Sequence, residues 1–362
     1  MNVWKHLTLP VVGSGLVALL FLSGSVGAAP RDGQGDFDFN FGVWKTHVKR
    51  LLHPLTGTSS WAEYDGKSVV SKVWDGRASL LELSVDGPAG HLEGFGLRLY
   101  NPQSHQWNLN WVSGAAGEFD QPMIGQFDGV RGEFVDQEVF GGKVILARNS
   151  FSDISADSAR FEQAFSDDGA RSWETNWVMT FARMPADAKA SSTTPVVGAL
   201  APERDGQRDF DFAFGAWKTH IKRLRDPLSG STNWLEYDGS HTIRSVSGGR
   251  ANLGELQAGG PAGHIEALSA RLYDPQTHLW HVSYGNPRDG SLSRPVVGQF
   301  KNGRGEFYGQ ETFQGRQVLV RELYSPIDAK GRRLEIAYSA DGGRSWETNW
   351  IMMDTLAEPK GH

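Results

Sequence analysis

The sequence predicts an all-β protein made of two tandem antiparallel β-barrels, which follow an N-terminal signal peptide and are joined by a linker. Three observations support this prediction: an apolar leader, a long duplication without gaps, and alternating apolar and polar residues over short runs. We place the signal peptide at residues 1–28, the first barrel at 31–183, the linker at 184–203 and the second barrel at 204–357.

The leader has the features of a secretory signal. It begins with Met1 and Lys5, continues through the apolar run Leu7–Leu22 and ends in the small residues Val26–Ala28. We therefore expect a periplasmic or secreted protein with no stable membrane span after the leader is cleaved. An uncleaved membrane anchor is the alternative, which the proline and glycines of the leader disfavour.

The rest of the chain consists of two copies of one domain. Trp44 recurs as Trp217 and Trp173 as Trp346, each 173 positions later, and 77 of the 150 residues from 31 to 180 are identical to their partners at this offset. A repeat of this length is a whole domain, because solenoid and propeller repeats are much shorter. The segment 184–203 between the copies is rich in Ala, Pro, Ser and Thr and has no periodicity, which is typical of a linker.

Each copy shows the two-residue alternation of β-strands, interrupted by turn residues. On one expected strand, the alternate residues His91, Glu93, Phe95, Leu97 and Leu99 form a row of side chains on the same face. The turn Asn101–His105 follows, and then Trp107, Leu109 and Trp111 share a face. About eight to ten such strands per copy favour an up-and-down barrel, because closure removes exposed sheet edges. We expect the row that starts at His91 to face the interior.

Composition excludes several classes of protein. The chain has no cysteine, so it forms no disulfide and no thiolate metal site. Its net charge of -6, with 36 basic and 42 acidic residues and no long basic run, argues against nucleic acid as a partner. No phosphate-binding loop, dinucleotide fingerprint, nucleophile elbow or HExxH motif is present, so we expect no cofactor and no metal.

Three motifs carry a resemblance to a known family. The segment Asp36–Trp44, repeated as Asp209–Trp217, ends in Gly-x-Trp, and both copies contain Trp-x-Glu-Tyr-x-Gly and Ser-x-Asp-Gly-x-x-x-Trp-Glu. These motifs resemble the calycin (lipocalin-like) barrels and, more closely, a bacterial family of uncharacterised lipocalin-like domains. The resemblance implies that Trp44 and Trp217 plug the barrel floors and that a late basic residue packs across each plug. Arg183 matches that basic residue in the first copy, but Leu356 stands at the equivalent position of the second.

A further local pattern occurs before each closing strand. Ser339–Trp346 fits the Asp-box hairpin of sialidase-type propellers, and the first copy has a near match around Asp168. A propeller would carry several such boxes at blade spacing. We therefore expect Asp168 and Asp341 to brace turns.

The polar candidates for a site are pairs of residues repeated in both copies. They are His91 with Glu93, His264 with Glu266, and the carboxylates Glu138 and Glu311. Facing inward, they would orient a ligand, act as acid and base, or hold a metal; facing outward, they would form weak surface pairs. These alternatives stay open at this point.

Aromatic residues on the expected inner faces complete the candidate site. They are Trp107, Trp111, Trp177, Trp280, Tyr284 and Trp350. They either fill the core or line a cavity, since small barrels can enclose one small molecule.

The function favoured by these features is binding of a small apolar or aromatic molecule inside the barrels. An acid–base enzyme of the hydratase or isomerase type, using His91 and Glu93, is one alternative; paired lipocalin-like domains resemble isoprenoid hydratases in outline. A non-catalytic envelope interaction protein is the other. Whether the two barrels contact each other is left open.

Overall fold

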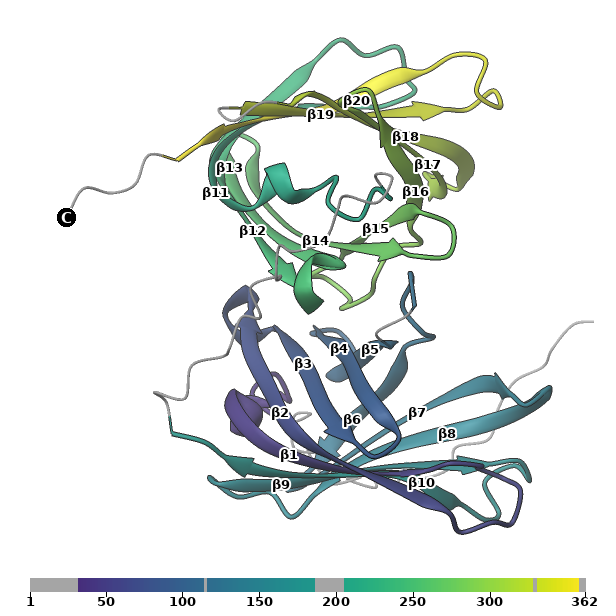
Figure 1. The fold of residues 1–362 in the computed structure, drawn as a ribbon. Helices are drawn as coiled ribbons and strands as arrows, with labels where there is room; N and C mark the ends of the chain where they lie inside the picture. The colour runs from purple at the N-terminus through teal and green to yellow at the C-terminus, as the bar shows by residue number, and fades with distance from the viewer. Residues whose placement is uncertain (1–31, 114–115, 186–204, 328–330, 358–362) are drawn as a thin grey trace, which may run out of the picture. The chain divides into compact units, whose positions relative to one another are not determined.

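The structure, a computed structural model, describes residues 32–113, 116–185, 205–327 and 331–357. Its strands form two closed antiparallel barrels in which each strand pairs with its neighbours in sequence and the last pairs with the first (Figure 1). The predicted all-β class and the two tandem barrels are therefore confirmed. The predicted leader at 1–28 and all but the first two residues of the linker at 184–203 lie outside the described residues.

The first barrel contains ten strands. They are β1 (Gly42–Leu51), β2 (Trp61–Val73), β3 (Ala78–Gly87), β4 (Gly90–Asn101), β5 (Gln106–Ser113), β6 (Met123–Asp128), β7 (Arg131–Phe140), β8 (Lys143–Ser152), β9 (Ser158–Ser166) and β10 (Glu174–Arg183). Closure is made by β1 and β10, which pair from Trp44↔Arg183 to Arg50↔Trp177.

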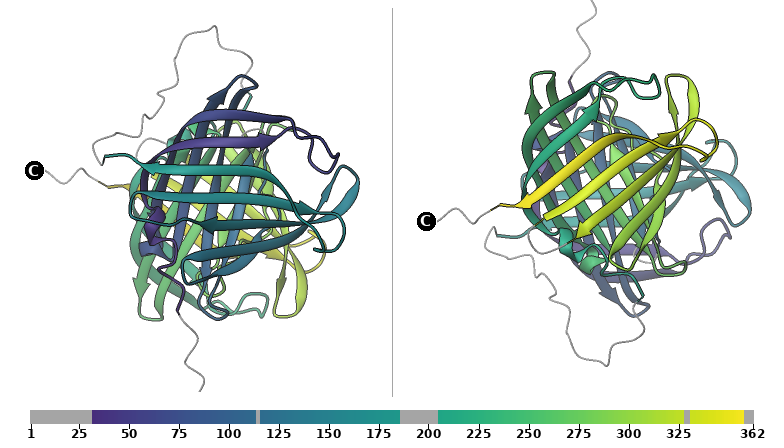
Figure 2. Two further views of the ribbon diagram at one scale, coloured as in Figure 1. Left: turned by 90° about the horizontal axis from the view of Figure 1, so that it is seen from below. Right: turned by 90° about the horizontal axis from the view of Figure 1, so that it is seen from above.

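The second barrel repeats this order. Its strands are β11 (Gly215–Leu224), β12 (Trp234–Val246), β13 (Ala251–Gly260), β14 (Gly263–Asp274), β15 (Leu279–Gly285), β16 (Val296–Lys301), β17 (Arg304–Phe313), β18 (Arg316–Ile327), β19 (Gly331–Ser339) and β20 (Glu347–Leu356). The two views of Figure 2 show the strands of each barrel lying side by side.

Helical structure is sparse. It consists of the short 3-10 helices η1 (Asp38–Asn40), η2 (Trp74–Gly76), η3 (Asp211–Ala213) and η4 (Ser247–Gly249). No helix in the described part of the chain has the length and apolar character needed to cross a bilayer.

The expected turns are present. The β4–β5 turn places His105 in the left-handed region at φ 57°, and its equivalent His278 has φ 58°. In the turn between β19 and β20, Asp341 accepts hydrogen bonds from the backbone N–H and the hydroxyl of Ser345, at 3.0 and 2.7 Å, and from the hydroxyl of Ser339. The aspartate therefore braces the hairpin, as the motif predicts.

The floor of the first barrel is built as the resemblance implies. Trp44 is fully buried, and its indole N–H donates to the carbonyl of Asn40 at 2.7 Å. The Arg183 guanidinium carbon lies 4.1 Å from the centroid of the Trp44 ring, and its N–H groups donate to the carbonyls of Phe39 and Phe41. The last strand thus supplies the basic residue that covers the plug.

In the second barrel, a different strand supplies the basic residue that covers the tryptophan. Arg332 of β19 lies over the ring of Trp217 at 4.4 Å from its centroid, and its Nε donates to Asp354 of β20 at 2.8 Å. Asp354 also accepts from Thr219 and contacts His241 Nδ1 at 3.0 Å. The departure at Leu356 is therefore compensated by a buried ion pair that the first barrel lacks.

Candidate functional site

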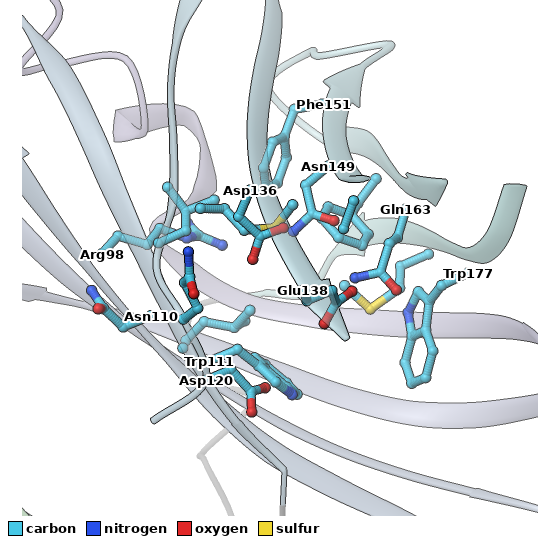
Figure 3. Close-up of a pocket in the computed structure, with 18 of the residues that line it drawn as sticks. Arg98, Asn110, Trp111, Asp120, Asp136, Glu138, Asn149, Phe151, Gln163 and Trp177 are labelled. Atoms are coloured by element: carbon cyan, nitrogen blue, oxygen red, sulfur yellow. The ribbon is translucent and has the colours of Figure 1, made fainter. Parts of the chain in front are cut away.

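The first barrel encloses a cavity of about 280 Å³ (Figure 3). Its walls come from the inner faces of β3 to β10, and its apolar lining includes Leu81, Leu83, Leu109, Phe161, Phe165 and Met179. Its polar lining includes Arg98, Asp120, Asp136, Glu138, Asn149 and Gln163. The volume is close to the lower end of the range for small-molecule sites, which starts at about 300 Å³.

Glycines in β4 make room for one wall of this cavity. Trp111 of β5 pairs with Gly96, and a Cβ built on Gly94 would lie 2.4 Å from the Trp111 ring. The indole therefore lies against the backbone of β4, which only glycine permits at this distance. Trp177 of β10 also lines the cavity, so two indole rings border its interior (Figure 3).

Acidic side chains from two segments line the same space. Asp136 and Glu138 alternate on β7, and Asp120 comes from the segment before β6, where its backbone N–H donates to the Trp111 carbonyl at 2.9 Å. In Figure 3, the Glu138 side chain lies between Trp111 and Trp177, and the Asp136 side chain lies between Arg98 and Asn149.

The environment of these carboxyls disfavours their charged form. Burial, followed by the neighbouring charges of Glu138 and Asp120, raises the pKa of Asp136 to about 7. Burial and the charge of Asp120 raise the pKa of Glu138, and burial and Glu118 raise that of Asp120. Asp136 Oδ1 and Asn149 Oδ1 are shut off from solvent and have no hydrogen-bond partner within the described part of the chain.

The basic residue of this lining is already engaged. Arg98 is 3% exposed, and its Nη1 donates to Asn40 Oδ1 at 2.8 Å. Its guanidinium also lies 4.3 Å from the centroid of Phe37. Burial lowers the pKa of Arg98 to about 9. Arg98 is therefore held towards the floor by Asn40 and Phe37.

The second barrel fills the equivalent space with its own hydrogen-bonded side chains. Trp111 is replaced by Tyr284 and Asn149 by Glu322, and the Tyr284 hydroxyl contacts the two Glu322 oxygens at 2.8 and 2.9 Å. The Tyr324 hydroxyl, at the position of Phe151, donates to the same carboxylate at 3.3 Å. A pocket of only about 10 Å³ lies beside Arg271 and Tyr324, whose equivalents line the large cavity.

The structure places the two histidine–glutamate pairs outside the interior. Residues Gly96 and Arg98 of β4 line the cavity, so the row containing His91 and Glu93 faces outward. This placement overturns the inward orientation expected from the sequence. His91 is exposed and contacts Asp86 at 2.8 Å, and the side chain of Glu93 is 34% exposed.

The equivalent residues of the second copy behave in the same way. His264 is exposed and Glu266 is half-buried on β14. Glu93 and Glu266 each form an ion pair with an arginine. In the first barrel, Phe95, Leu97 and Leu99 of the same row are buried in an apolar cluster with Ala78 and Leu80 of β3, outside the cavity lining. Their hydrophobicity is what makes this row look like an interior face in the sequence.

The other candidates divide between cavity and core. Trp111, Trp177 and Glu138 line the cavity. Trp107 and Trp280 are buried core residues whose indole N–H groups donate to the carbonyls of Gly33 and Gly206, at 3.0 and 2.9 Å. Trp350 packs against the core of the second barrel. Glu311 is exposed and is hydrogen-bonded to the hydroxyl of Tyr338. Burial, followed by this hydrogen bond, raises the pKa of Tyr338.

Sequence reasoning missed Asp120, Asp136 and Asn149. Asp136 carries a usable signal, because it lies two residues before Glu138, and strand residues two apart share a face. Asp120 and Asn149 carry none, since neither the path of the segment before β6 nor the face of β8 follows from local pattern. The described residues contain no group of three His, Asp or Glu residues placed to hold a metal ion.

Comparison with known proteins adds only distant similarities. No family model and no curated protein matches the chain. Among solved structures, a protein of unknown function from the DUF3598 family of Nostoc punctiforme is 12% identical, with 90% of this chain and 100% of that chain covered and a TM-score of 0.26.

Two further structures are similar at this level. A single-site mutant of transferrin-binding protein B from Haemophilus parasuis is 7% identical over 86% of this chain and 76% of its own, with a TM-score of 0.20. A putative AttH from Nitrosomonas europaea is 8% identical over 91% of this chain and 98% of its own, with a TM-score of 0.15. Scores this low assign neither a family nor an activity. The fold and the site define a tandem β-barrel protein whose first barrel encloses a cavity.

Proposed function

We propose that this protein binds a small, largely apolar or aromatic molecule inside its first barrel, as an exported lipocalin-like binding protein. The observation that supports the proposal is the cavity of about 280 Å³ with Trp111 and Trp177 in its walls. An apolar cavity with a few directed polar groups is the usual form of a small-molecule site. The second barrel has the same strand order but occupies the equivalent interior with Tyr284 and Glu322.

The test is calorimetric titration of the mature protein with the neutral probes indole and 2-phenylethanol, together with native mass spectrometry for a retained molecule. Ala147→Phe and Gly96→Leu place new atoms in the cavity, whereas Val139→Phe adds a ring at a site on β7 that is 72% exposed. We expect both cavity variants to lose probe binding and the Val139 variant to keep it. Binding that survives in both folded cavity variants, or a wild type that binds neither these neutral probes nor a charged analogue of the same size, would overturn the proposal.

One observation favours an acid–base enzyme as a second candidate. Asp136 combines a pKa of about 7 with a position in the cavity, and perturbed carboxyls of this kind are typical of catalytic sites. The role expected for His91 and Glu93 would pass to Asp136. Hydrogen–deuterium exchange at the α-carbon of phenylacetone, followed by NMR, tests this candidate, which requires exchange that is lost in Asp136→Asn.

A further inference from the structure

The carboxyl groups of the first barrel lack the partners that a buried acidic group requires. Among the described residues, none of Asp120, Asp136 and Glu138 forms an ion pair, and Asp136 Oδ1 is buried without a hydrogen-bond donor. The Arg98 guanidinium in the same lining donates its hydrogen bond to Asn40 Oδ1. Burial of unpaired carboxylates is costly, so this arrangement calls for a positive group from outside the chain.

The second barrel supplies the partners of its interior carboxylate from its own side chains. Its buried carboxylate, Glu322, is 1% exposed and accepts hydrogen bonds from Tyr284 and Tyr324. At the position of Asp136 this barrel has Gly309, and at that of Asp120 it has Ser293. The unpartnered acidic set is therefore a property of the hollow barrel and not of the fold.

We propose that the ligand of the first barrel is an organic cation, an aromatic or aliphatic amine whose ammonium group is held by Asp136 in the electrostatic field of Glu138 and Asp120. This inference rests on the proposed function and specifies the chemical class of its ligand. The apolar body of the amine lies against Trp111 and Trp177, whose ring faces attract a positive charge. An ammonium group supplies both the donors that Asp136 Oδ1 lacks and the charge that relieves repulsion among the three carboxyls.

An organic cation fits this cavity better than a metal ion. The described residues contain no group of three acidic or histidine side chains placed to ligate a metal, and the cavity has room for a molecule of several atoms. Most of its remaining lining, such as Leu83, Phe161 and Met179, is apolar, which suits a hydrocarbon or aromatic body.

The test compares three probes of the same size and different charge. Calorimetric titrations of the mature protein at pH 8 use 2-phenylethylamine as the cation, 2-phenylethanol as the neutral analogue and phenylacetate as the anion. We expect the amine to bind at least about tenfold more tightly than the alcohol and the anion not to bind. Trimethyl(2-phenylethyl)ammonium, which has charge but no N–H donor, separates charge recognition from hydrogen bonding.

Variants assign the preference to the carboxyls. Asp136→Asn and Glu138→Gln should each reduce the preference for the amine over the alcohol by about tenfold, whereas binding of the alcohol stays within about twofold. Glu133→Gln is the matched control, because Glu133 lies on the same strand but is exposed on the outer face. It should leave both affinities unchanged.

The outcomes separate this inference from the proposed function. Equal binding of amine and alcohol, or an amine preference that persists in both folded variants, overturns the inference while the cavity remains a binding site. No binding of any probe, charged or neutral, removes the proposed function and the inference together.

Discussion

Arg332 lies over the indole ring of Trp217 with its guanidinium carbon 4.4 Å from the ring centroid, in the place that Arg183 takes over Trp44 in the first barrel. The two arginines come from different strands, because Arg332 is equivalent to Ala159 and Arg183 to Leu356. In the second barrel, the arginine on β19 has a buried acidic partner, Asp354. Asp354 replaces Phe181, and burial alone would raise its pKa, but His241 and Arg332 together hold that pKa below its usual range.

Arg332→Leu should destabilise the protein by about 3–5 kcal/mol, because it leaves Asp354 buried without its charge partner. Chemical denaturation followed by tryptophan fluorescence measures this change. Arg333→Leu is the control: its side chain is 38% exposed and paired with Glu335, so we expect a loss of less than about 1 kcal/mol. Equal losses in the two variants would contradict the role given to Arg332.

The floor of the second barrel should accept the residues of the first. The triple variant Arg332→Ala, Asp354→Phe and Leu356→Arg recreates the set Ala159, Phe181 and Arg183. We expect it to recover most of the stability lost by Arg332→Leu, since it leaves no unpaired charge and restores an arginine near Trp217. His241, the equivalent of Ser68, is the residue left without its partner. A triple variant less stable than Arg332→Leu would show that the two floors are not interchangeable.

Tyr284→Phe should make the protein more sensitive to alkaline pH. Burial raises the pKa of Glu322 to about 7, so the folded state binds this proton more tightly than the unfolded state does. The free energy of unfolding therefore falls as the pH rises from about 4.5 to about 7. Loss of the Tyr284 hydroxyl raises the folded pKa further and extends the fall to higher pH, with a loss of about 1–3 kcal/mol at pH 8 and less at pH 5.

Denaturant titrations at pH 5 and pH 8 measure this effect. Tyr308→Phe is the control, because its hydroxyl also donates to a glutamate, Glu306, but on the surface. A Tyr284 variant with the same loss at both pH values would argue against a charged Glu322.

Asp136→Asn should stabilise the free protein at pH 8. The pKa of Asp136 is raised to about 7, so ionisation of this carboxyl costs stability as the pH rises from about 4 to about 7. Removing the charge should recover about 1–2 kcal/mol at pH 8 after allowance for solvent screening, and almost nothing at pH 4. The exposed Asp128→Asn serves as a control in the same denaturation series. Destabilisation by Asp136→Asn at pH 8 would mean that the charge has a partner in the protein.

Asp341→Asn should weaken the turn before β20 at neutral pH and remove its acid sensitivity. The Ser345 hydroxyl and backbone N–H and the Ser339 hydroxyl hold the pKa of Asp341 below its usual range. A depressed folded pKa gives stability above the unfolded pKa that is lost as the pH falls below about 4. The denaturation midpoint of the variant should therefore be lower at pH 7 and closer to that of the wild type at pH 3. An equal difference at both pH values would contradict this account.

The sequence predicts the barrels well because their signals are local or are repeated at a fixed offset. The 173-residue offset defines two domains, and the alternation around Trp107 and Trp111 predicts the β4–β5 hairpin and the inner face of β5. The same alternation fails at β4. Phe95 and Leu97 are as hydrophobic as an interior row, but the interior row is Gly96 and Arg98, because small residues there make room for Trp111.

Periodicity divides a strand into two rows of side chains, but it does not say which row faces the interior when both are buried. The amino-acid sequence by itself determined the two closed domains and their hairpins, since each follows from spacing along the chain, whereas the tryptophan floor was implied by the resemblance to lipocalin-like barrels. Only the tertiary structure decided that one barrel is hollow and the other filled, because cavity volume depends on how side chains from eight strands meet. Contacts between strands distant in the sequence also place Asp120, Asp136 and Glu138 in one cavity lining. In the second barrel they place Arg332 over the Trp217 ring, where the first barrel has Arg183 over Trp44.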